Sequence, residues 1–198
     1  MRMVSLLPPV SSIALKEWAV ACNALRDGTQ IVILRKGGIH KDDHNFSDTF
    51  ADYPEFLLFP TYEHQSPDLV KPQYHRELEL SLAEDDVPGL TTISAFAQVT
   101  DRIQVDDAGR LEAISEFHIW SDDYVQKRLQ WRPRQPLTVA LVRVYPLIQP
   151  QALPLLDEYA GCRSWVELGQ DVPMGALSPI LSDADYDRTR VDIAQRLA

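Results

Sequence analysis

A polar cluster follows the apolar run of residues 56–59, in the stretch FLLFPTYEHQ. Glu63 and His64 have the side chains that general acid or base catalysis uses, and Tyr62 and Gln65 can orient a substrate. Because successive side chains of an extended segment point to opposite faces, Glu63 and His64 cannot face one ligand without a turn, whereas Tyr62 and His64 can. The pattern predicts a ligand site at Thr61, Tyr62, His64 and Gln65, with a packed polar loop as the alternative interpretation.

A group of cations surrounds a tryptophan in the segment KRLQWRPR, residues 127–134. No Asp or Glu occurs between residues 124 and 156, although the whole chain has a formal net charge of −10. That net charge argues against general coating of duplex nucleic acid and confines any phosphate contact to a local surface. Cations beside an aromatic ring suit a single-stranded nucleic acid or a phosphorylated ligand, and a solvated helix end is the alternative. We therefore expect contacts to phosphates or bases from Arg128, Trp131, Arg132 and Arg134.

The segment RKGG is a second candidate for anion binding. Arg35 and Lys36 supply positive charge, and the backbone amides at Gly37 and Gly38 can approach an anion closely because no side chain intervenes. The spacing of a P-loop is absent, which argues against a nucleoside-triphosphate site. An ordinary turn with solvated cations is the alternative interpretation.

The segment FHIW places an imidazole and an indole two positions apart. If the segment is extended, His118 and Trp120 share one face and offer a stacking surface to a base. The alternative is a half-buried strand in which Trp120 fills the core.

No metal or cofactor site is predicted. His40 and His44 are four residues apart, but the preceding glycines argue against the helix that would bring their rings to one zinc ion. Cys22 and Cys162 are too few for a disulfide framework or a Cys-rich zinc site, so we expect free thiols. Cys162 lacks an identifiable base or oxyanion donor, and the segment GCRSW is expected to form a structural corner with Trp165 in the core.

The elements that position these residues follow from apolar periodicity. Helices are predicted at SSIALKEWAVACNALRDG (11–28), SDDYVQKRLQW (121–131, capped by Ser121) and LSDADYDRTRVDIAQRLA (181–198, with Ser182 and Asp185 in capping-box spacing). Strands are predicted at QIVILRKGGI (30–39), EFLLFPT (55–61), TTISAFAQVTDRIQV (91–105) and PLTVALVRVYPL (136–147). LEAISEFHIW (111–120) is expected to pair with the third of these strands across a turn at DDAGR, and PQYHRELELSLAEDD (72–86) fits either a short helix or an exposed strand.

This order predicts an α+β fold in which a mixed, strongly curled sheet or a small β-barrel is flanked by N- and C-terminal helices. Strands beginning near Gln30, Glu55, Thr92 and Leu137 are too apolar for a surface, so we expect all four in one sheet system. The chain is expected to be a single domain over 1–198, with a flexible stretch at 1–12 and a terminal helix at 182–198. Neither a membrane span nor a signal peptide is evident, which favours a cytoplasmic location, and the oligomeric state is left open.

Three stretches, ALKEWAVACNAL…IVILRKGGI, FLLFPTYEHQ and GCRSWVEL, resemble a bacterial family known as domain of unknown function 1802. That resemblance extends from the first helix to about Leu168 and implies no particular reaction. The succession EFLLFPT, TTISAFAQVTDRIQVDD and PLTVALVRVYPLIQPQALPLL resembles the strands of PUA-like barrels, the group that includes EVE and ASCH domains. This second resemblance implies RNA or a modified base bound in a cleft on the barrel.

Together these observations favour a non-catalytic domain that binds RNA, another single-stranded nucleic acid or a nucleotide-like ligand. The alternative is a metal-dependent hydrolase or nuclease built on Tyr62, Glu63 and His64. A module that only docks other proteins is a third class. Convergence of the cations of 127–134 and the loop 35–38 on one cleft would favour binding, whereas a cleft lined by carboxylates would favour catalysis.

Overall fold

The computed structural model describes residues 7–36, 38–39, 46–47, 49–83, 89–131, 133, 135–161 and 164–198. The strands are β1 (Val10–Trp18), β2 (Val32–Lys36), β3 (Gly38–Ile39), β4 (Phe46–Ser47), β5 (Glu55–Thr61), β6 (Leu90–Val105), β7 (Leu137–Pro154) and β8 (Trp165–Pro173). The α-helices are α1 (Ala19–Arg26), α2 (Thr49–Asp52), α3 (His75–Ala83), α4 (Ala108–Glu112), α5 (Asp122–Gln130) and α6 (Asp183–Arg196). Short 3₁₀ turns are η1 (Pro67–Leu69), η2 (Pro72–Tyr74), η3 (Ser115–Phe117) and η4 (Asp157–Tyr159).

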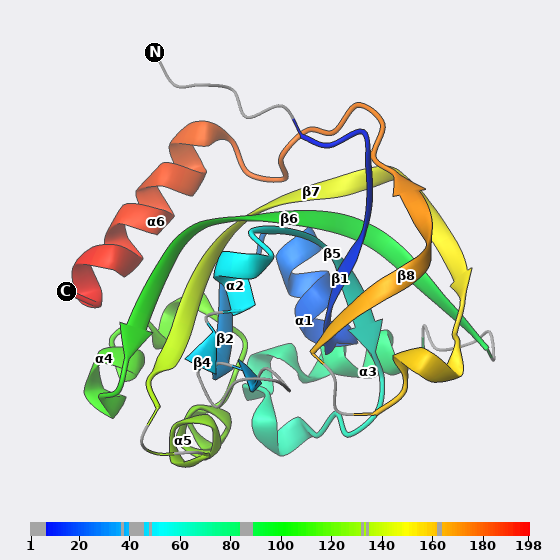
Figure 1. The fold of residues 1–198 in the computed structure, drawn as a ribbon. Coiled ribbons are helices and arrows are strands. Elements are labelled where there is room, and N and C mark those ends of the chain that lie inside the picture. The colour runs from blue at the N-terminus through cyan, green and yellow to red at the C-terminus, as the bar shows by residue number, and fades with distance from the viewer. Residues whose placement is uncertain are drawn as a thin grey trace.

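Six strands form one mixed sheet in the order β2-β7-β6-β5-β1-β8, with β3 and β4 as a separate pair (Figure 1). Strands β1 and β5 are parallel, and the other neighbours in the sheet are antiparallel. Strands β6 and β7 form a long antiparallel ribbon within the sheet, and the first part of β7 is an almost continuous buried run, as its apolar sequence requires. The predicted single sheet containing the strands near residues 30, 55, 92 and 137 is therefore confirmed.

The predicted first helix is wrong in its first half. Residues Val10–Trp18 form β1, and only Ala19–Arg26 are helical. Ala14 and Leu15 are both buried because β1 lies between β5 and β8 and has apolar neighbours on both of its faces. A strand with apolar residues on both faces has a sequence spacing similar to that of a helix. Pairing with β5 and β8 decides that this segment is a strand. Strand β1 also begins within the stretch 1–12 that was expected to be flexible.

The predicted hairpin across DDAGR is also wrong. Asp107 accepts a hydrogen bond from the Arg110 amide (2.9 Å) and caps α4, so the chain after β6 turns into a helix instead of pairing back. Only Trp120 from that segment makes a strand-like bridge, to Val70. The ambiguous segment beginning at Pro72 is a 3₁₀ turn followed by α3. The segment GCRSW was expected to form a structural corner, and its last residue, Trp165, begins β8.

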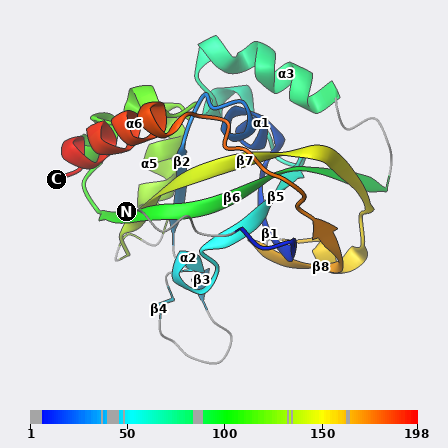
Figure 2. The same cartoon turned by 90° about the horizontal axis from the view of Figure 1, so that it is seen from above.

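Helices pack onto the sheet from several directions. Helix α1 lies between α3 and strands β5, β6 and β7 (Figure 2). The predicted terminal helix is confirmed as α6, where Ser182 accepts a hydrogen bond from the Asp185 amide (3.1 Å). Tyr186 on α6 is buried in the same apolar cluster as residues of α1, β2, β7 and α5. None of the helices in the described part of the chain has the length and apolar character needed to cross a membrane.

Candidate functional site

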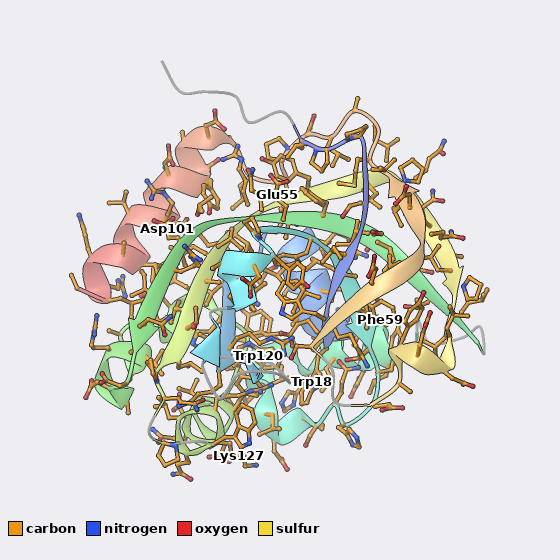
Figure 3. The ribbon with its side chains drawn as sticks, in the orientation of Figure 1. Trp18, Glu55, Phe59, Asp101, Trp120 and Lys127 are labelled. Carbon is orange, nitrogen blue, oxygen red and sulfur yellow. The ribbon has the colours of Figure 1, made fainter. Side chains whose placement is uncertain are left out.

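An open pocket of about 320 Å³ lies where the end of β1 meets α5. It is lined by Trp18, Leu69, Tyr124, Lys127, Arg128 and Trp131. Figure 3 shows Trp18, Trp120 and Lys127 in this region, with Glu55 and Asp101 on distant parts of the sheet. Three separate parts of the chain, β1, η1 and α5, therefore contribute its walls.

Helix α5 presents four of these side chains because of their spacing. Tyr124, Lys127, Arg128 and Trp131 are at positions i, i+3, i+4 and i+7, which lie on one face of a helix. Ser121 caps the helix by accepting a hydrogen bond from the Tyr124 amide (3.3 Å), as the sequence predicted. The cap fixes the start of α5 and with it the direction of this face.

Leu69 is tied to the same helix through backbone contacts. The Ser121 amide donates to the Leu69 carbonyl (3.1 Å), and the Lys71 amide donates to the Ile119 carbonyl (2.9 Å). The Ser121 hydroxyl also donates to the Asp68 carbonyl (2.8 Å). The 3₁₀ turn η1 and the first turn of α5 thus form one rigid border of the pocket.

A layered stack supports the pocket from the core. The rings of Trp120 and Tyr124 are parallel, with centroids 4.0 Å apart and an interplanar angle of 9°. The Arg128 Cζ atom lies 5.0 Å from the Tyr124 centroid, over the other face because Trp120 occupies the first. Trp18 meets the stack edge-on, with its centroid 5.4 Å from that of Trp120. The stack holds the Arg128 guanidinium in a fixed orientation at the pocket.

The two tryptophans expected to stack on a base differ in exposure. Trp120 is only 2 % exposed and does not line the pocket, so the expectation that it stacks on a ligand is corrected: it supports Tyr124 from behind. Trp131 is 48 % exposed and lines the pocket. Arg132 and Arg134, the other predicted phosphate contacts, lie outside the described residues.

The charge of Arg35 is used inside the protein. Its Nη2 atom lies 3.1 Å from Oε2 of Glu17, which is only 6 % exposed, and its Nη1 donates to the Ser164 hydroxyl (3.2 Å). Oε1 of Glu17 accepts a hydrogen bond from the Trp18 amide (3.0 Å). This ion pair therefore holds the backbone that carries Trp18.

Lys36 is also engaged with the protein. It is buried, and its Nζ atom donates to the carbonyls of Leu129 (3.1 Å) and Gln135. Burial lowers the pKa of Lys36. The Leu129 carbonyl belongs to the last turn of α5, where carbonyls lack helical partners, so Lys36 fixes the end of the helix next to Trp131. Gly37 lies outside the described residues, and Gly38 begins β3.

The loop 61–65 also makes contacts within the protein. The Thr61 hydroxyl donates to the Glu17 carbonyl (3.1 Å), and Oε1 of Gln65 accepts from the Val20 amide (3.3 Å) at the start of α1. Glu63 and His64 are exposed, His64 has a positive φ of 62°, and neither lines the pocket. The turn that Glu63 and His64 would need to face one ligand is thus present, but neither residue is among those that line the pocket.

His118 is buried behind the pocket. It is 2 % exposed, and neither ring nitrogen has a hydrogen-bond partner among the described residues. Burial, together with the neighbouring Lys71, lowers the pKa of His118 to about 3. The imidazole is therefore neutral at physiological pH. His118 and Trp120 do not form the stacking surface considered above, and Trp120 fills the core, as in the alternative interpretation.

No group of three or more His, Cys, Asp or Glu side chains that could hold a metal ion occurs in the described part of the chain. His40, His44 and Cys162 lie outside it. Cys22 is a buried free thiol, and burial raises its pKa well above the ordinary value, so it is a poor nucleophile.

Sequence reasoning missed Trp18, Leu69 and Tyr124 as pocket residues. Tyr124 could have been found, because it shares the i, i+3, i+4, i+7 stripe with the cations and Trp131. Trp18 could not, since assigning residues 11–28 to one helix concealed that a strand ends at this residue. Leu69 depends on pairing between η1 and the segment before α5, which no local pattern indicates.

Comparisons with known proteins give two similar structures and one family. Two crystal structures of ZmASCH from Zymomonas mobilis, a Tyr-to-Phe and a Ser-to-Ala variant, are similar to this chain. The first has 13 % identity and a TM-score of 0.43, covering 79 % of this chain and 88 % of that one. The second has 14 % identity and a TM-score of 0.42, covering 94 % and 99 %.

No curated protein matches the chain. The family model described as "Domain of unknown function (DUF1802)" matches residues 14–192, from the middle of β1 almost to the end of α6. This range includes every residue that lines the pocket. The chain therefore belongs to the DUF1802 family.

Proposed function

We propose that this protein binds a single-stranded nucleic acid or a nucleotide-like ligand in the α5 pocket, without catalysing a reaction. The observation that carries the proposal is the composition of the pocket wall: Trp18 and Trp131 beside the cations Lys127 and Arg128. An aromatic face stacks on any base, and adjacent cations neutralise its phosphate. We also propose that the protein is bacterial and cytoplasmic, as expected from the sequence.

The geometry of Arg128 supports tight binding. Its guanidinium is already ordered over Tyr124, so a ligand does not have to immobilise a free side chain. A guanidinium offers several N–H donors in a fixed plane, which suits a phosphate group. The pocket volume of about 320 Å³ is at the small end of the roughly 300–1,000 Å³ typical of small-molecule sites.

We also infer that the sheet is strongly curled, as expected from the sequence. The support is in the β6–β7 ribbon, where the register shifts between Ile93 and Ala95 and again between Val99 and Asp101. Such bulges bend a strand and increase its twist. A bend of this kind would carry β7 and β2 around toward the helices that border the pocket.

A salt titration of binding to single-stranded RNA and DNA tests the proposal. If Arg128 contacts a phosphate, Arg128→Ala should lower affinity and flatten the slope of log affinity against log salt by about one unit. Arg188 on α6 is a matched control, since it is an exposed cation outside the pocket, and Arg188→Ala should leave the slope unchanged. Absence of binding at low salt, or equal effects of the two substitutions, would reject the proposal.

A further inference from the structure

The polar side chains that line the α5 pocket are hydrogen-bond donors. Trp18 and Trp131 each carry an indole N–H, Lys127 an ammonium group and Arg128 a guanidinium, and none of these groups accepts a hydrogen bond. Among the described residues that line the pocket, only Tyr124 has a side-chain atom that can also accept, its hydroxyl oxygen. The walls therefore suit a ligand that presents acceptors.

The hydroxyl of Tyr124 is itself committed to donating. Arg128 acts on its oxygen as a hydrogen-bond donor, and a guanidinium cannot accept in return. The hydroxyl proton has no acceptor among the described residues. Burial and the negative charge of Glu17 raise the pKa of Tyr124, so this proton is retained at physiological pH. A buried O–H without an acceptor is costly, and a ligand that supplies an acceptor removes that cost.

Glu17 does not accept this proton. Its Oε1 atom accepts the Trp18 amide (3.0 Å), and its Oε2 atom lies 3.1 Å from Nη2 of Arg35. The carboxylate acts on Tyr124 through its charge and makes no hydrogen bond to the hydroxyl. The donor of Tyr124 is therefore left for a ligand in the pocket that this residue lines.

The hydroxyl is covered in the free protein, and Arg128 can uncover it. Tyr124 is only 4 % exposed, with Trp120 stacked on one face of its ring and the edge of Trp18 6.3 Å away. These two rings hold Tyr124 in place. The Arg128 guanidinium over the other face is at the end of a flexible side chain, and a ligand phosphate attracts it. A small shift of the guanidinium toward the phosphate exposes the hydroxyl while the ring stays fixed.

We propose that the pocket selects a base whose edge presents a carbonyl oxygen in place of an exocyclic amino group, with Tyr124 as the donor that identifies it. The proposal rests on the proposed function and specifies its ligand. The base stacks on Trp18 or Trp131, Tyr124 donates to the carbonyl oxygen, and the cations of α5 meet the phosphate. An amino group at the same place would lose its hydration and find no side-chain acceptor on the described walls. A free nucleotide and a nucleotide within a strand both present this chemistry.

The test uses short strands with an abasic backbone and a single base, in RNA and in DNA, at low salt. The matched pairs are uracil against cytosine and hypoxanthine against adenine, in which a carbonyl replaces an amino group. Uracil and hypoxanthine should each bind at least about tenfold more tightly than their amino counterparts. Competition by uridine monophosphate would show that a free nucleotide is sufficient, and failure to compete alongside strand binding would show that a strand is required.

Two results of these titrations would reject different claims. Equal affinity within either pair, or tighter binding of the amino base, would overturn this inference but leave the proposed function intact. No binding of any probe would reject both.

Tyr124→Phe tests the residue that identifies the base. The substitution keeps the ring between Trp120 and Arg128 and removes only the hydroxyl, so the uracil-to-cytosine affinity ratio should fall toward one. Tyr159→Phe is the matched control, because Tyr159 is also 4 % exposed but its hydroxyl accepts the Gly169 amide (2.8 Å) outside the pocket. The control should leave the ratio unchanged.

The free energy of unfolding of the two variants gives a second readout. Tyr159→Phe should cost more stability than Tyr124→Phe, because only the Tyr159 hydroxyl has a backbone partner in the fold. An unchanged affinity ratio in Tyr124→Phe, or a loss of stability as large as that of Tyr159→Phe, would show that the Tyr124 hydroxyl serves the fold and not the ligand.

Discussion

The cations at the end of β2 and those on α5 are the same residue types in very different surroundings. Arg35 pairs with the buried Glu17, and Lys36 donates to two backbone carbonyls. Arg128 is instead laid over an aromatic ring at the pocket wall, next to the exposed Lys127. The partners of a cation, and not its presence in a motif, therefore decide whether it is available to a ligand.

The difference follows from the position of each element. Strand β2 is buried along most of its length, so polar groups that it carries inward must find partners inside the protein. Helix α5 buries Tyr124 and Val125, leaves Arg128 and Leu129 half-buried and exposes its other side chains. Arg35 and Lys36 hold Trp18 and the end of α5 in place. Lys127 and Arg128 line the pocket beside them and can contact a ligand there.

The largest expected effect comes from breaking the Glu17–Arg35 ion pair. Arg35→Ala should lower the free energy of unfolding by about 3–5 kcal/mol, because it leaves the Glu17 carboxylate buried without its counter-ion. Urea denaturation with the midpoint and slope fitted separately is the measurement.

Arg26→Ala is the matched control for this change. Arg26 pairs with Asp27 at a largely exposed site, and its loss should cost less than about 1 kcal/mol. A double variant, Arg35→Met with Glu17→Gln, should recover part of the loss because neither charge remains. Equal costs for Arg35→Ala and Arg26→Ala would contradict the structural role given to Arg35.

Trp131→Ala tests the other side of the comparison. Because Trp131 is 48 % exposed, its removal should change the free energy of unfolding by less than about 0.5 kcal/mol. Loss of a stacking platform should weaken single-strand binding by about 1–3 kcal/mol with little change in salt dependence. Fluorescence anisotropy measures the change in affinity, and urea denaturation measures the change in the free energy of unfolding.

Trp131→Phe is the conservative control, since it keeps an aromatic face and should retain most of the affinity. Binding that does not respond to either substitution would exclude Trp131 from the site. A loss of stability as large as the loss of affinity would instead assign it a structural role.

The sequence predicted the four strands near residues 30, 55, 92 and 137 and the cap of α5, because these depend on local pattern. The apolar run from Leu137 and the Ser121 cap are both confirmed. Where the sequence failed, the deciding interaction is remote along the chain: β1 is a strand because β5 and β8 flank it, and Arg35 is unavailable because Glu17 is its partner. Half of the pocket stripe on α5 was predicted, through Arg128 and Trp131, whereas Trp18 and Leu69 required the tertiary structure.

His118 is a buried titratable group whose ring nitrogens, unlike the guanidinium of Arg35, have no hydrogen-bond partner among the described residues. Its pKa is about 3 in the folded protein and about 6.5 in an unfolded chain, so the unfolded state takes up the proton first as pH falls. The stability that the neutral ring contributes is complete above pH 6.5 and is lost progressively toward pH 3. Between pH 7.5 and 5.5 the free energy of unfolding should fall by about 1.4 kcal/mol from this residue.

His118→Phe should remove that dependence of stability on pH, and His75→Ala, at a histidine nearer the surface, should keep it. If His118→Phe leaves the slope unchanged, the imidazole reaches solvent or a partner in solution, and the core behind the Trp120–Tyr124–Arg128 stack opens more readily than its burial implies.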